Sequence, residues 1–373
     1  MKKALLPLLL VIPLVACNNT SSSYTPVTNV KASVSGHFTE AQLKYLSSED
    51  YLDTTPYNGN MSVSKPLPVN ITWEAGEGTY QVYINNDSNN ETTIYETSEK
   101  SFDFYNPVFG QSYTVNVKFN DSIVPTSFIE YPSVPGPRNI FVDGVENFRD
   151  IGGWGKFVDG HYKTFIKQGM IYRSGRFNDD KEETVKVSIT NEGLYEINNH
   201  LKIKTEIDLR RTSNNEVGGL TNKSVLGDNV HYVQLPMAYG GNNILTFNAK
   251  LSGDDYQYNN PLMIKNFFEI LADEKSYPIN YHCSIGKDRT GCLSYLIEGL
   301  LGFDQETMFR DYMFTNFANA GMCKATDITD RYGKTLDEYP NGDTLQEKVY
   351  NYLNQEIGVS KENLDKIIEI LKA

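Results

Sequence analysis

The sequence predicts two domains: an all-β sandwich, followed by an α/β domain whose mostly parallel central sheet is flanked by helices. In the first part of the chain, apolar and polar residues alternate with a period of two, which is typical of half-buried strands. After about residue 138, short apolar segments alternate with segments of helical spacing, which is typical of α/β folds. The 373 residues are enough for two domains with separate cores.

Composition and charge exclude several classes of function. The 34 basic and 47 acidic residues give a net charge of -13, and such an acidic chain is not expected to bind nucleic acid, whose phosphates attract basic surfaces. The four cysteines form no C-x-x-C pair, and no two of the five histidines have the helical spacing of metal ligands. We therefore expect no metal site.

The first residues have the layout of a secretory signal. Lys2 and Lys3 precede an apolar run that is too short to cross a bilayer as a helix. The run ends in L-V-A-C, which resembles the lipobox of bacterial lipoproteins. The resemblance implies a signal peptide over residues 1–16, a lipid anchor on Cys17 at the extracytoplasmic face of the cell membrane, and a flexible tether over residues 17–26. The alternative is an ordinary signal peptide in which Cys17 is incidental.

Residues 27–133 are expected to form the β-sandwich. Short alternating strands, such as L-P-V-N-I-T-W-E-A around Trp73, are separated by turn-forming clusters. The pattern resembles fibronectin type III and related immunoglobulin-like modules, with Trp73 as the core tryptophan and Tyr113 as the corner tyrosine. The resemblance implies a spacer or a docking module for a protein or glycan partner. Within it, F-T-E-A-Q-L-K-Y-L-S-S-E-D-Y-L is either a short helix or an insertion, and Y-P-S-V-P-G-P reads as the linker to the next domain.

Residues 138–373 are expected to form the α/β domain. Three apolar segments predict strands at 204–210, 229–237 and 277–283, and four segments of helical spacing predict helices at 260–274, 291–302, 304–318 and 360–373. Cys283 lies where the third strand ends and a helix begins. Ligands in such folds bind beyond the carboxyl ends of the parallel strands.

The loop H-C-S-I-G-K-D-R-T-G, which contains Cys283, has the properties of an anion cradle. Backbone N–H groups at the start of a helix attract anions, and Gly286 and Gly291 permit a tight turn. Arg289 adds a planar guanidinium that matches two phosphate oxygens. A cysteine in such a positive field ionises readily and becomes a nucleophile. Thr290 can donate its hydroxyl to the sulfur.

This loop resembles the H-C-x5-R-[ST]-G signature of the protein tyrosine phosphatase superfamily, and its G-K-D-R-T-G resembles the atypical bacterial tyrosine/serine and phosphoinositide phosphatases. Further motifs of that family occur in order over residues 138–373: N-F-R-D-I-G-G at 147–153, Y-R-S-G at 172–175, I-D-L-R at 207–210, D-Y-M-F-T-N at 311–316, and E-I-G-V-S-K-E-N-L at 356–364. One departure is Glu216, which follows the D-L-R motif at a longer distance than the family's usual glutamate.

The resemblance implies a phosphatase that acts through a phosphocysteine at Cys283 and needs no cofactor. It implies that substrates are phosphorylated proteins, with phosphotyrosine first, and phosphoserine or phosphoinositides as further substrates. The implied substrate-binding residues are Ser284, Ile285, Gly286, Lys287, Thr290, Asp208 and Arg210.

The general acid is less well defined. Neither tryptophan is followed by Pro-Asp, so the mobile W-P-D loop of many tyrosine phosphatases is missing from the sequence. The resemblance points to Asp288 inside the loop as the proton donor, beside the catalytic Arg289, with Asp208 as the alternative. Lys287 either contacts a polyanionic substrate or is a solvated lysine.

The remaining polar residues and cysteines could have structural rather than functional roles. Arg149 and Asp150 could pair with each other, whereas Arg173 and Arg210 could be buried partners of carboxylates. His282 is expected to orient the loop by hydrogen bonding. Two cysteines, Cys292 and Cys323, are expected in the core.

Two other functions remain open at the level of the sequence. A sulfur transferase of the rhodanese type also places a cysteine at the head of a cradle loop, although Arg289 and the preceding Lys-Asp argue against it. A surface binding protein with an inert second domain is the other alternative, and the intact Cys283, Arg289 and Thr290 argue against that.

Overall fold

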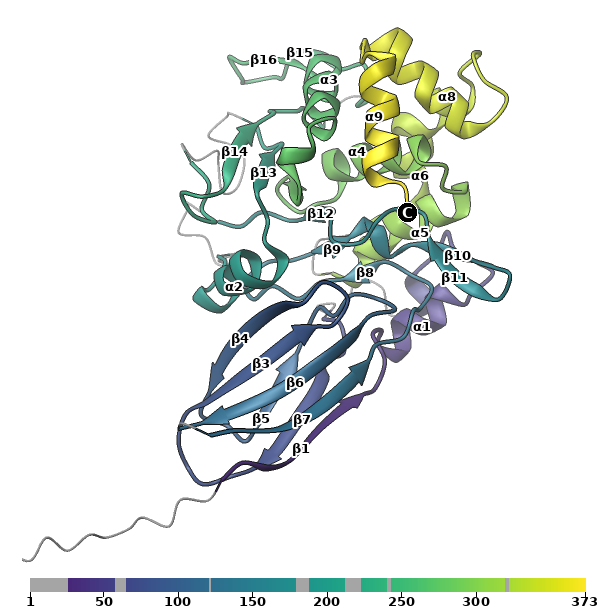
Figure 1. Ribbon diagram of the computed structural model, residues 1–373. Coiled ribbons are helices and arrows are strands. Elements are labelled where there is room, and N and C mark those ends of the chain that lie inside the picture. The colour runs from purple at the N-terminus through teal and green to yellow at the C-terminus, as the bar shows by residue number, and fades with distance from the viewer. Residues whose placement is uncertain are drawn as a thin grey trace, which may run out of the picture.

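The computed structural model describes residues 26–57, 65–120, 122–178, 188–211, 223–239, 243–318 and 322–373. The predicted signal peptide, Cys17, almost all of the tether, and Glu216 lie outside the described residues. Figure 1 shows a β-sandwich below a larger α/β domain. Within the described ranges, every helix is too short or too polar to span a bilayer.

The N-terminal region is all-β apart from one short helix, and its strands form two antiparallel sheets. Their orders are β1-β2-β5 and β4-β3-β6-β7. The strands are β1 (Thr28–Val34), β2 (Val69–Glu74), β3 (Tyr80–Asn86), β4 (Glu91–Thr97), β5 (Ser101–Phe104), β6 (Ser112–Phe119) and β7 (Ser122–Glu130). This arrangement confirms the predicted all-β region.

The sandwich core follows from the alternation in the sequence. Along β2, Val69, Ile71 and Trp73 are buried and the residues between them are exposed, because successive side chains of a strand point to opposite faces. The amide of Val108 donates a 2.7 Å hydrogen bond to the hydroxyl of Tyr113, a contact of the kind that a corner tyrosine makes. Residues 38–52, for which a short helix and an insertion were the two alternatives, contain α1 (Glu40–Leu46), which begins after Thr39 in a capping box.

A buried ion pair joins the linker to the α/β domain. Arg138 donates to Asp150 at 2.8 and 3.0 Å, and it also donates to the carbonyl of Asn106 in the sandwich at 3.0 Å. Arg138 and Asp150 are both essentially inaccessible to solvent. Breaking such a pair would leave an uncompensated buried charge, so the contact fixes where the second domain begins relative to the first.

The central sheet of the α/β domain has six strands in the order β14-β13-β17-β12-β9-β8. They are β8 (Arg138–Asn139), β9 (Arg149–Asp150), β12 (Ile171–Ser174), β13 (Thr205–Asp208), β14 (His231–Gln234) and β17 (Ile279–His282). The four strands from β14 to β12 are parallel, whereas β9 and β8 are antiparallel to their neighbours. The sheet is therefore mixed rather than mostly parallel, because the chain leaving the linker pairs along its edge before the parallel strands begin.

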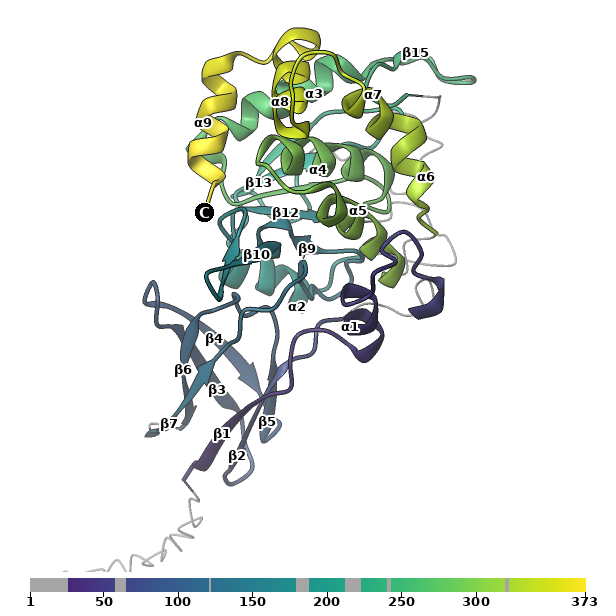
Figure 2. The ribbon, with the colours of Figure 1, turned by 90° about the vertical axis from the view of Figure 1, so that its right-hand side faces the viewer.

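Helices cover this sheet, and one of them is buried on all sides. The helices are α2 (Asn191–Tyr195), α3 (Asn260–Leu271), α4 (Asp288–Leu300), α5 (Gln305–Phe314), α6 (Ala325–Ile328), α7 (Lys334–Asp337), α8 (Leu345–Tyr352) and α9 (Lys361–Leu371). Figure 2 shows α4 between α8 and the strands of the sheet. Every residue of α4 after Asp288 is buried, which explains why its sequence after Gly291 is mainly apolar. Gly302, with φ of 80°, lies just beyond its end and stops it.

The predicted elements of this domain are confirmed, with ends that differ by a few residues. The elements that were not predicted include the helices α2, α6, α7 and α8, the strands β8, β9 and β12, and two hairpins, β10 (Gly155–Val158) with β11 (His161–Thr164), and β15 (Asn248–Lys250) with β16 (Gln257–Asn259). The hairpin strands have mostly exposed or half-buried side chains, so their sequences lack the apolar pattern that indicates a strand.

Candidate active site

Cys283 lies at the centre of the parallel sheet, at the carboxyl end of β17. It is the first residue after the strand and is 2% exposed, and α4 begins five residues later at Asp288. Strands β12 and β13 flank β17 in parallel, so three strands end at this edge. This is the position in an α/β fold where a ligand meets strand ends and a helix N-terminus together.

The tight turn of the loop requires glycine at position 286. Gly286 has φ of 71°, a conformation that residues with side chains rarely adopt. A Cβ atom there would lie 2.5 Å from the carbonyl oxygen of Ser174 and 2.9 Å from Nδ2 of Asn147. Both the backbone conformation and the close approach of β12 therefore exclude any larger residue.

Three side chains hold the carbonyl groups of the loop. Arg176 donates to the carbonyl of Ser284 at 3.1 Å, and Asn147 donates to the carbonyls of Ile285 and Gly286 at 3.0 and 3.1 Å. Nη2 of Arg173 donates to the carbonyl of Gly286 at 2.8 Å. Since these contacts engage carbonyl oxygens, they leave the amide groups of the loop and of the first turn of α4 for an anion.

The buried carboxylate of Asp311 on α5 positions two of these donors. It accepts from Nε of Arg149 at 2.9 Å, from Nη1 of Arg173 at 2.7 Å and from the indole of Trp154 at 3.0 Å. Burial opposes ionisation, but the charges of Arg149 and Arg173 prevail and lower the pKa of Asp311 to about 2. Arg149 in turn donates to Oδ1 of Asn147 at 2.6 Å. The hypothesis that Arg149 pairs with Asp150 is wrong, because neighbouring residues of a strand point to opposite faces.

Glu298 on α4 is a second buried carboxyl group beside this cluster. It is 1% exposed, and burial together with the nearby charge of Asp311 raises its pKa well above the usual value. The protonated, uncharged form of Glu298 is therefore favoured next to the charged Asp311.

Arg289 and Thr290 occupy the first turn of α4. Arg289 is 3% exposed, and its Nη1 donates to the carbonyls of Leu209 and Met237 at 3.1 and 3.4 Å. Its guanidinium also lies 4.9 Å from the centre of the Tyr239 ring. The hydroxyl of Thr290 is buried without a hydrogen-bond partner among the described residues, so it remains able to donate to a ligand or to a nearby sulfur.

Asp208 and Arg210 form a buried pair. Arg210 donates to both carboxylate oxygens of Asp208 at 2.6 to 3.0 Å, and the hydroxyl of Tyr232 adds a bond of 2.9 Å. Burial opposes ionisation, yet the charges of His282 and Arg210 lower the pKa of Asp208 below its usual value. The pair confirms that Arg210 is a buried partner of a carboxylate. It also makes Asp208 a poor proton donor.

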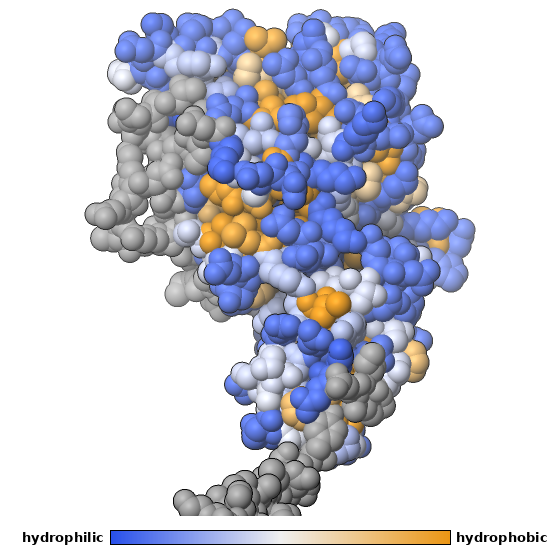
Figure 3. All heavy atoms as spheres, turned by 60° about the vertical axis from the view of Figure 1, so that its left-hand side comes forward, coloured by the Kyte–Doolittle hydropathy of each residue, from blue (hydrophilic) through white to orange (hydrophobic). Residues whose placement is uncertain are grey.

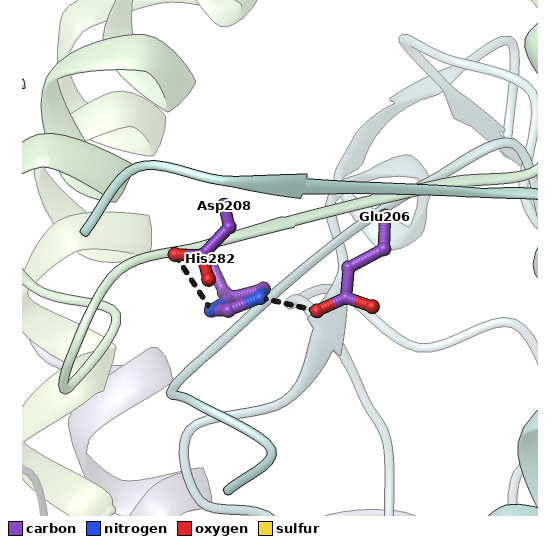
Figure 4. A group of neighbouring side chains, drawn as sticks. All are labelled: Glu206, Asp208 and His282. Atoms are coloured by element: carbon purple, nitrogen blue, oxygen red, sulfur yellow. Dashed lines mark hydrogen bonds and ion pairs between the residues drawn. The ribbon is translucent and has the colours of Figure 1, made fainter. Parts of the chain in front are cut away.

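Figure 4 shows His282 between the carboxylates of Asp208 and Glu206. Its Nε2 lies 3.0 Å from Glu206, and its Nδ1 lies 3.2 Å from the carbonyl of Cys283 and 3.9 Å from Asp208. His282 thus connects the end of β13 to the nucleophile, in line with the predicted orienting role.

These three side chains, Glu206, Asp208 and His282, also have the composition of a metal site, with ligand atoms within 4.8 Å of one another. Their hydrogen bonds do not fit a cation, however. Both oxygens of Asp208 accept from Arg210, and Glu206 accepts from His282 and from Ser224. A metal ion would have to displace these donors and lie beside a guanidinium.

Lys287 and Asp288 face the segment that follows α5. Lys287 donates to the carbonyl of Met322 at 2.6 Å and lies 3.2 Å from Asp327, while Asp288 forms an ion pair with Arg331. Lys287 is therefore not simply solvated, because its ammonium group contacts Met322 and Asp327. The side chain of Asp288 remains 18% exposed, unlike that of Asp208.

The two remaining cysteines are buried and free, as expected for core residues. Cys292 is fully buried within α4, and burial raises its pKa. Burial likewise raises the pKa of Cys323 to about 12. Neither thiol is disposed to react at neutral pH.

Reasoning from the sequence found the loop but missed the roles of Asn147, Arg176, Tyr239 and Asp311 as supporting residues. Asn147 and Asp311 begin two of the recognised motifs, so a signal was present for both. The pairings were missed because their partners lie 138 to 162 residues away in the chain.

A cysteine at a strand end, a glycine turn, and an arginine in the first turn of the following helix give an α/β fold with a loop suited to bind an anion. Residues 140–373 match the model of the tyrosine phosphatase family, and the chain belongs to this family.

Similarity to individual proteins is more distant. A protein of Cupriavidus necator, named as a tyrosine-protein phosphatase, is 23% identical over 207 residues, which cover 50% of this chain and 67% of the relative. Among solved structures, the catalytic core of the PP-IP phosphatase SIW14 from S. cerevisiae, in complex with citrate, is 19% identical, with a TM-score of 0.30, over 52% of this chain and 88% of that one. TpbA of P. aeruginosa in complex with phosphotyrosine is 16% identical, with a TM-score of 0.27, over 48% of this chain and 85% of that one.

Gly286→Ala is expected to weaken binding of an oxyanion such as vanadate about a hundredfold, because the new Cβ pushes the loop away from Ser174. Isothermal titration calorimetry measures the affinity. Gly160→Ala is the matched control, since Gly160 has φ of 79° but open space around it. Equal loss of affinity in both variants would contradict the steric explanation.

Glu298→Gln is expected to gain stability over the parent protein as the pH rises above about 4.5, by at most about 1.4 kcal/mol per pH unit. The raised pKa keeps the buried carboxyl protonated in the folded protein, whereas the unfolded chain releases that proton. The stability of the parent therefore falls with pH until the folded group also ionises, and glutamine escapes this loss.

Urea unfolding between pH 4 and pH 8 measures the difference between Glu298→Gln and the parent. Glu40→Gln serves as the control, because its hydrogen bond with Lys44 lowers the pKa of the exposed Glu40 and no gain with pH is expected there. A difference for Glu298→Gln that does not change with pH would show that its carboxyl is ionised in the folded protein.

Proposed function

We propose that the protein is a cysteine-dependent phosphatase that hydrolyses phosphate monoesters through a phosphocysteine at Cys283. Phosphotyrosine is the first substrate, with phosphoserine, phosphothreonine and phosphoinositides as further substrates. The observation that carries the proposal is the loop itself: Asn147, Arg173 and Arg176 hold its carbonyl groups, which leaves its amides for the phosphate next to Cys283.

The first step transfers the phosphoryl group to the enzyme. The Cys283 thiolate attacks phosphorus, the ester P–O bond breaks, and the leaving oxygen receives a proton from Asp288. The amides of Ser284 to Lys287 and the guanidinium of Arg289 hold the three non-bridging oxygens. These oxygens carry the charge in the transition state, so their fixed donors lower the barrier.

The second step regenerates the enzyme. Water attacks phosphorus, the S–P bond breaks, the proton of water passes to Asp288, and inorganic phosphate leaves. The hydroxyl of Thr290, which has no other partner among the described residues, donates to the departing sulfur. We prefer Asp288 as the acid–base residue because its side chain is partly exposed, although it pairs with Arg331, whereas Asp208 is fully buried between Arg210 and Tyr232.

The location of the protein is part of the same proposal. A lipid on Cys17 would hold the enzyme at the extracytoplasmic face of the membrane, with residues 17–26 as the tether and the β-sandwich as a spacer or docking module for a protein or glycan.

Cys283→Ser is expected to lower hydrolysis of p-nitrophenyl phosphate at least about a thousandfold, because the serine hydroxyl is a far weaker nucleophile at neutral pH. Release of nitrophenolate measures the rate, and mass spectrometry after acid quench detects the phosphoryl group on Cys283. Cys323→Ser, at a buried thiol outside the loop, should keep most of the activity. Turnover of thiosulfate without phosphatase activity would instead support a sulfur transferase, and neither activity would indicate a binding protein.

Asp288→Asn is expected to slow hydrolysis of phenyl phosphate by about a hundredfold or more, and that of p-nitrophenyl phosphate much less, because nitrophenolate leaves without protonation. Steady-state rates with both esters give the ratio. Asp327→Asn removes a neighbouring negative charge and should slow both esters equally. An unchanged ratio in Asp288→Asn would exclude Asp288 as the proton donor.

A further inference from the structure

A cavity of about 670 Å³ lies between the β-sandwich and the α/β domain. One wall comes from β4 and β5, with Tyr95 and Phe102, and the other from Phe141 and α2, with Tyr195. No residue of the Cys283 loop lines it. Figure 1 shows α2 directly above β4, and Figure 3, which brings this side forward, shows a mainly hydrophilic surface with separate hydrophobic patches.

The walls of this cavity, here called the junction cavity, are aromatic. The ring of Tyr95 packs against Phe102 and Tyr195 with centroids 4.7 and 5.7 Å apart, and Tyr105 packs against Phe141 at 4.6 Å. The faces of such rings carry negative electrostatic potential and attract organic cations.

Five carboxylates line the cavity. Glu196 accepts hydrogen bonds from Tyr95 and Asn106 and lies beside His200, and the other four belong to Glu96, Asp103, Asp143 and Glu192. Across the part of the chain that the structure describes, none of the four has a lysine or arginine within ion-pair distance. Glu96 and Asp103 receive hydrogen bonds only from the amides of Gln81 and Asn70. Burial raises the pKa of Tyr195, and the negative charges of Glu196 and Glu96 raise it further. The potential in the junction cavity is therefore negative, and it complements a cation.

An ammonium group already contacts one of these rings. Nζ of Lys65 lies 4.1 Å from the centre of the Phe141 ring. Lys65 lines a neighbouring pocket rather than the junction cavity, so this contact shows only that the Phe141 ring accepts a primary ammonium on one face.

Hydrogen bonds between the two domains fix the walls of the cavity relative to each other. The hydroxyl of Tyr95 donates to Glu196 at 3.0 Å, the hydroxyl of Tyr195 donates to the carbonyl of Ile94, and Asn106 donates to Glu196 at 2.6 Å. A preformed pocket loses little entropy when a ligand enters.

We propose that the junction cavity binds a small organic cation, with an ammonium group between the carboxylates and an apolar body against the rings. The size of the cavity falls within the range of about 300–1,000 Å³ that is usual for small-molecule sites. Neither wall belongs to the catalytic loop, so the proposal does not depend on the phosphatase activity.

The test compares 2-phenylethylamine, which is cationic at pH 7, with the neutral 2-phenylethanol by isothermal titration calorimetry on the protein. The amine is expected to bind at least about tenfold more tightly, and the double variant Asp143→Asn, Glu192→Gln is expected to remove most of that preference. Glu49→Gln, which removes an exposed charge outside the cavity, should leave the affinity unchanged.

Equal affinity for the amine and the alcohol would overturn the proposal, as would an equal loss of affinity in Glu49→Gln and in the double variant. Binding of a lysine-containing peptide without binding of the amine would likewise overturn it, in favour of a protein partner. Crystal soaking with the amine locates it directly, and density anywhere other than between α2 and β4 would also count against it.

Discussion

The carboxylate of Asp311 is the contact on which the site depends. It is buried between Arg149 and Arg173. Arg173 also donates to a carbonyl of the loop, and Arg149 also donates to Asn147, which itself donates to a loop carbonyl. Without Asp311, two guanidinium groups would face each other in the core at a cost of several kcal/mol. Burial, together with the charge of Asp311, raises the pKa of Glu298, the next carboxyl in the cluster, and outweighs the opposing effect of the two arginines.

This dependence sets how far the site could be predicted from the sequence. Cys283, Gly286 and Arg289 lie within seven residues of one another in the chain, so a single short motif was enough to predict the loop. The α4 helix and the strand before it were predictable because their burial is reflected in mainly apolar sequences. Asp311 and Asn147 meet the loop only through the fold, and no local pattern encodes a contact across more than a hundred residues.

Adjacency in the sequence was also a poor guide to pairing. Arg149 and Asp150 are neighbours, yet they face opposite sides of β9, and one reaches α5 while the other reaches the linker through Arg138. Asp208 and Asp288 show the same effect for function. Asp208 ends a strand and is fully buried between Arg210 and His282, whereas Asp288 begins α4, pairs with Arg331 and is partly exposed. Burial thus gives the two candidate acids different environments that spacing alone could not predict.

The distribution of charge explains how so acidic a chain can attract a phosphate. With a net charge of -13, the average field repels anions. The fold counters this locally, because it gathers Arg149, Arg173 and Arg176 behind one loop, with the buried carboxylate of Asp311 between Arg149 and Arg173. At the junction cavity, four carboxylates without a lysine or arginine partner in the described chain lie near aromatic rings. The proposed phosphate site and the proposed cation site therefore share no lining residue, and each has the local charge that its ligand needs.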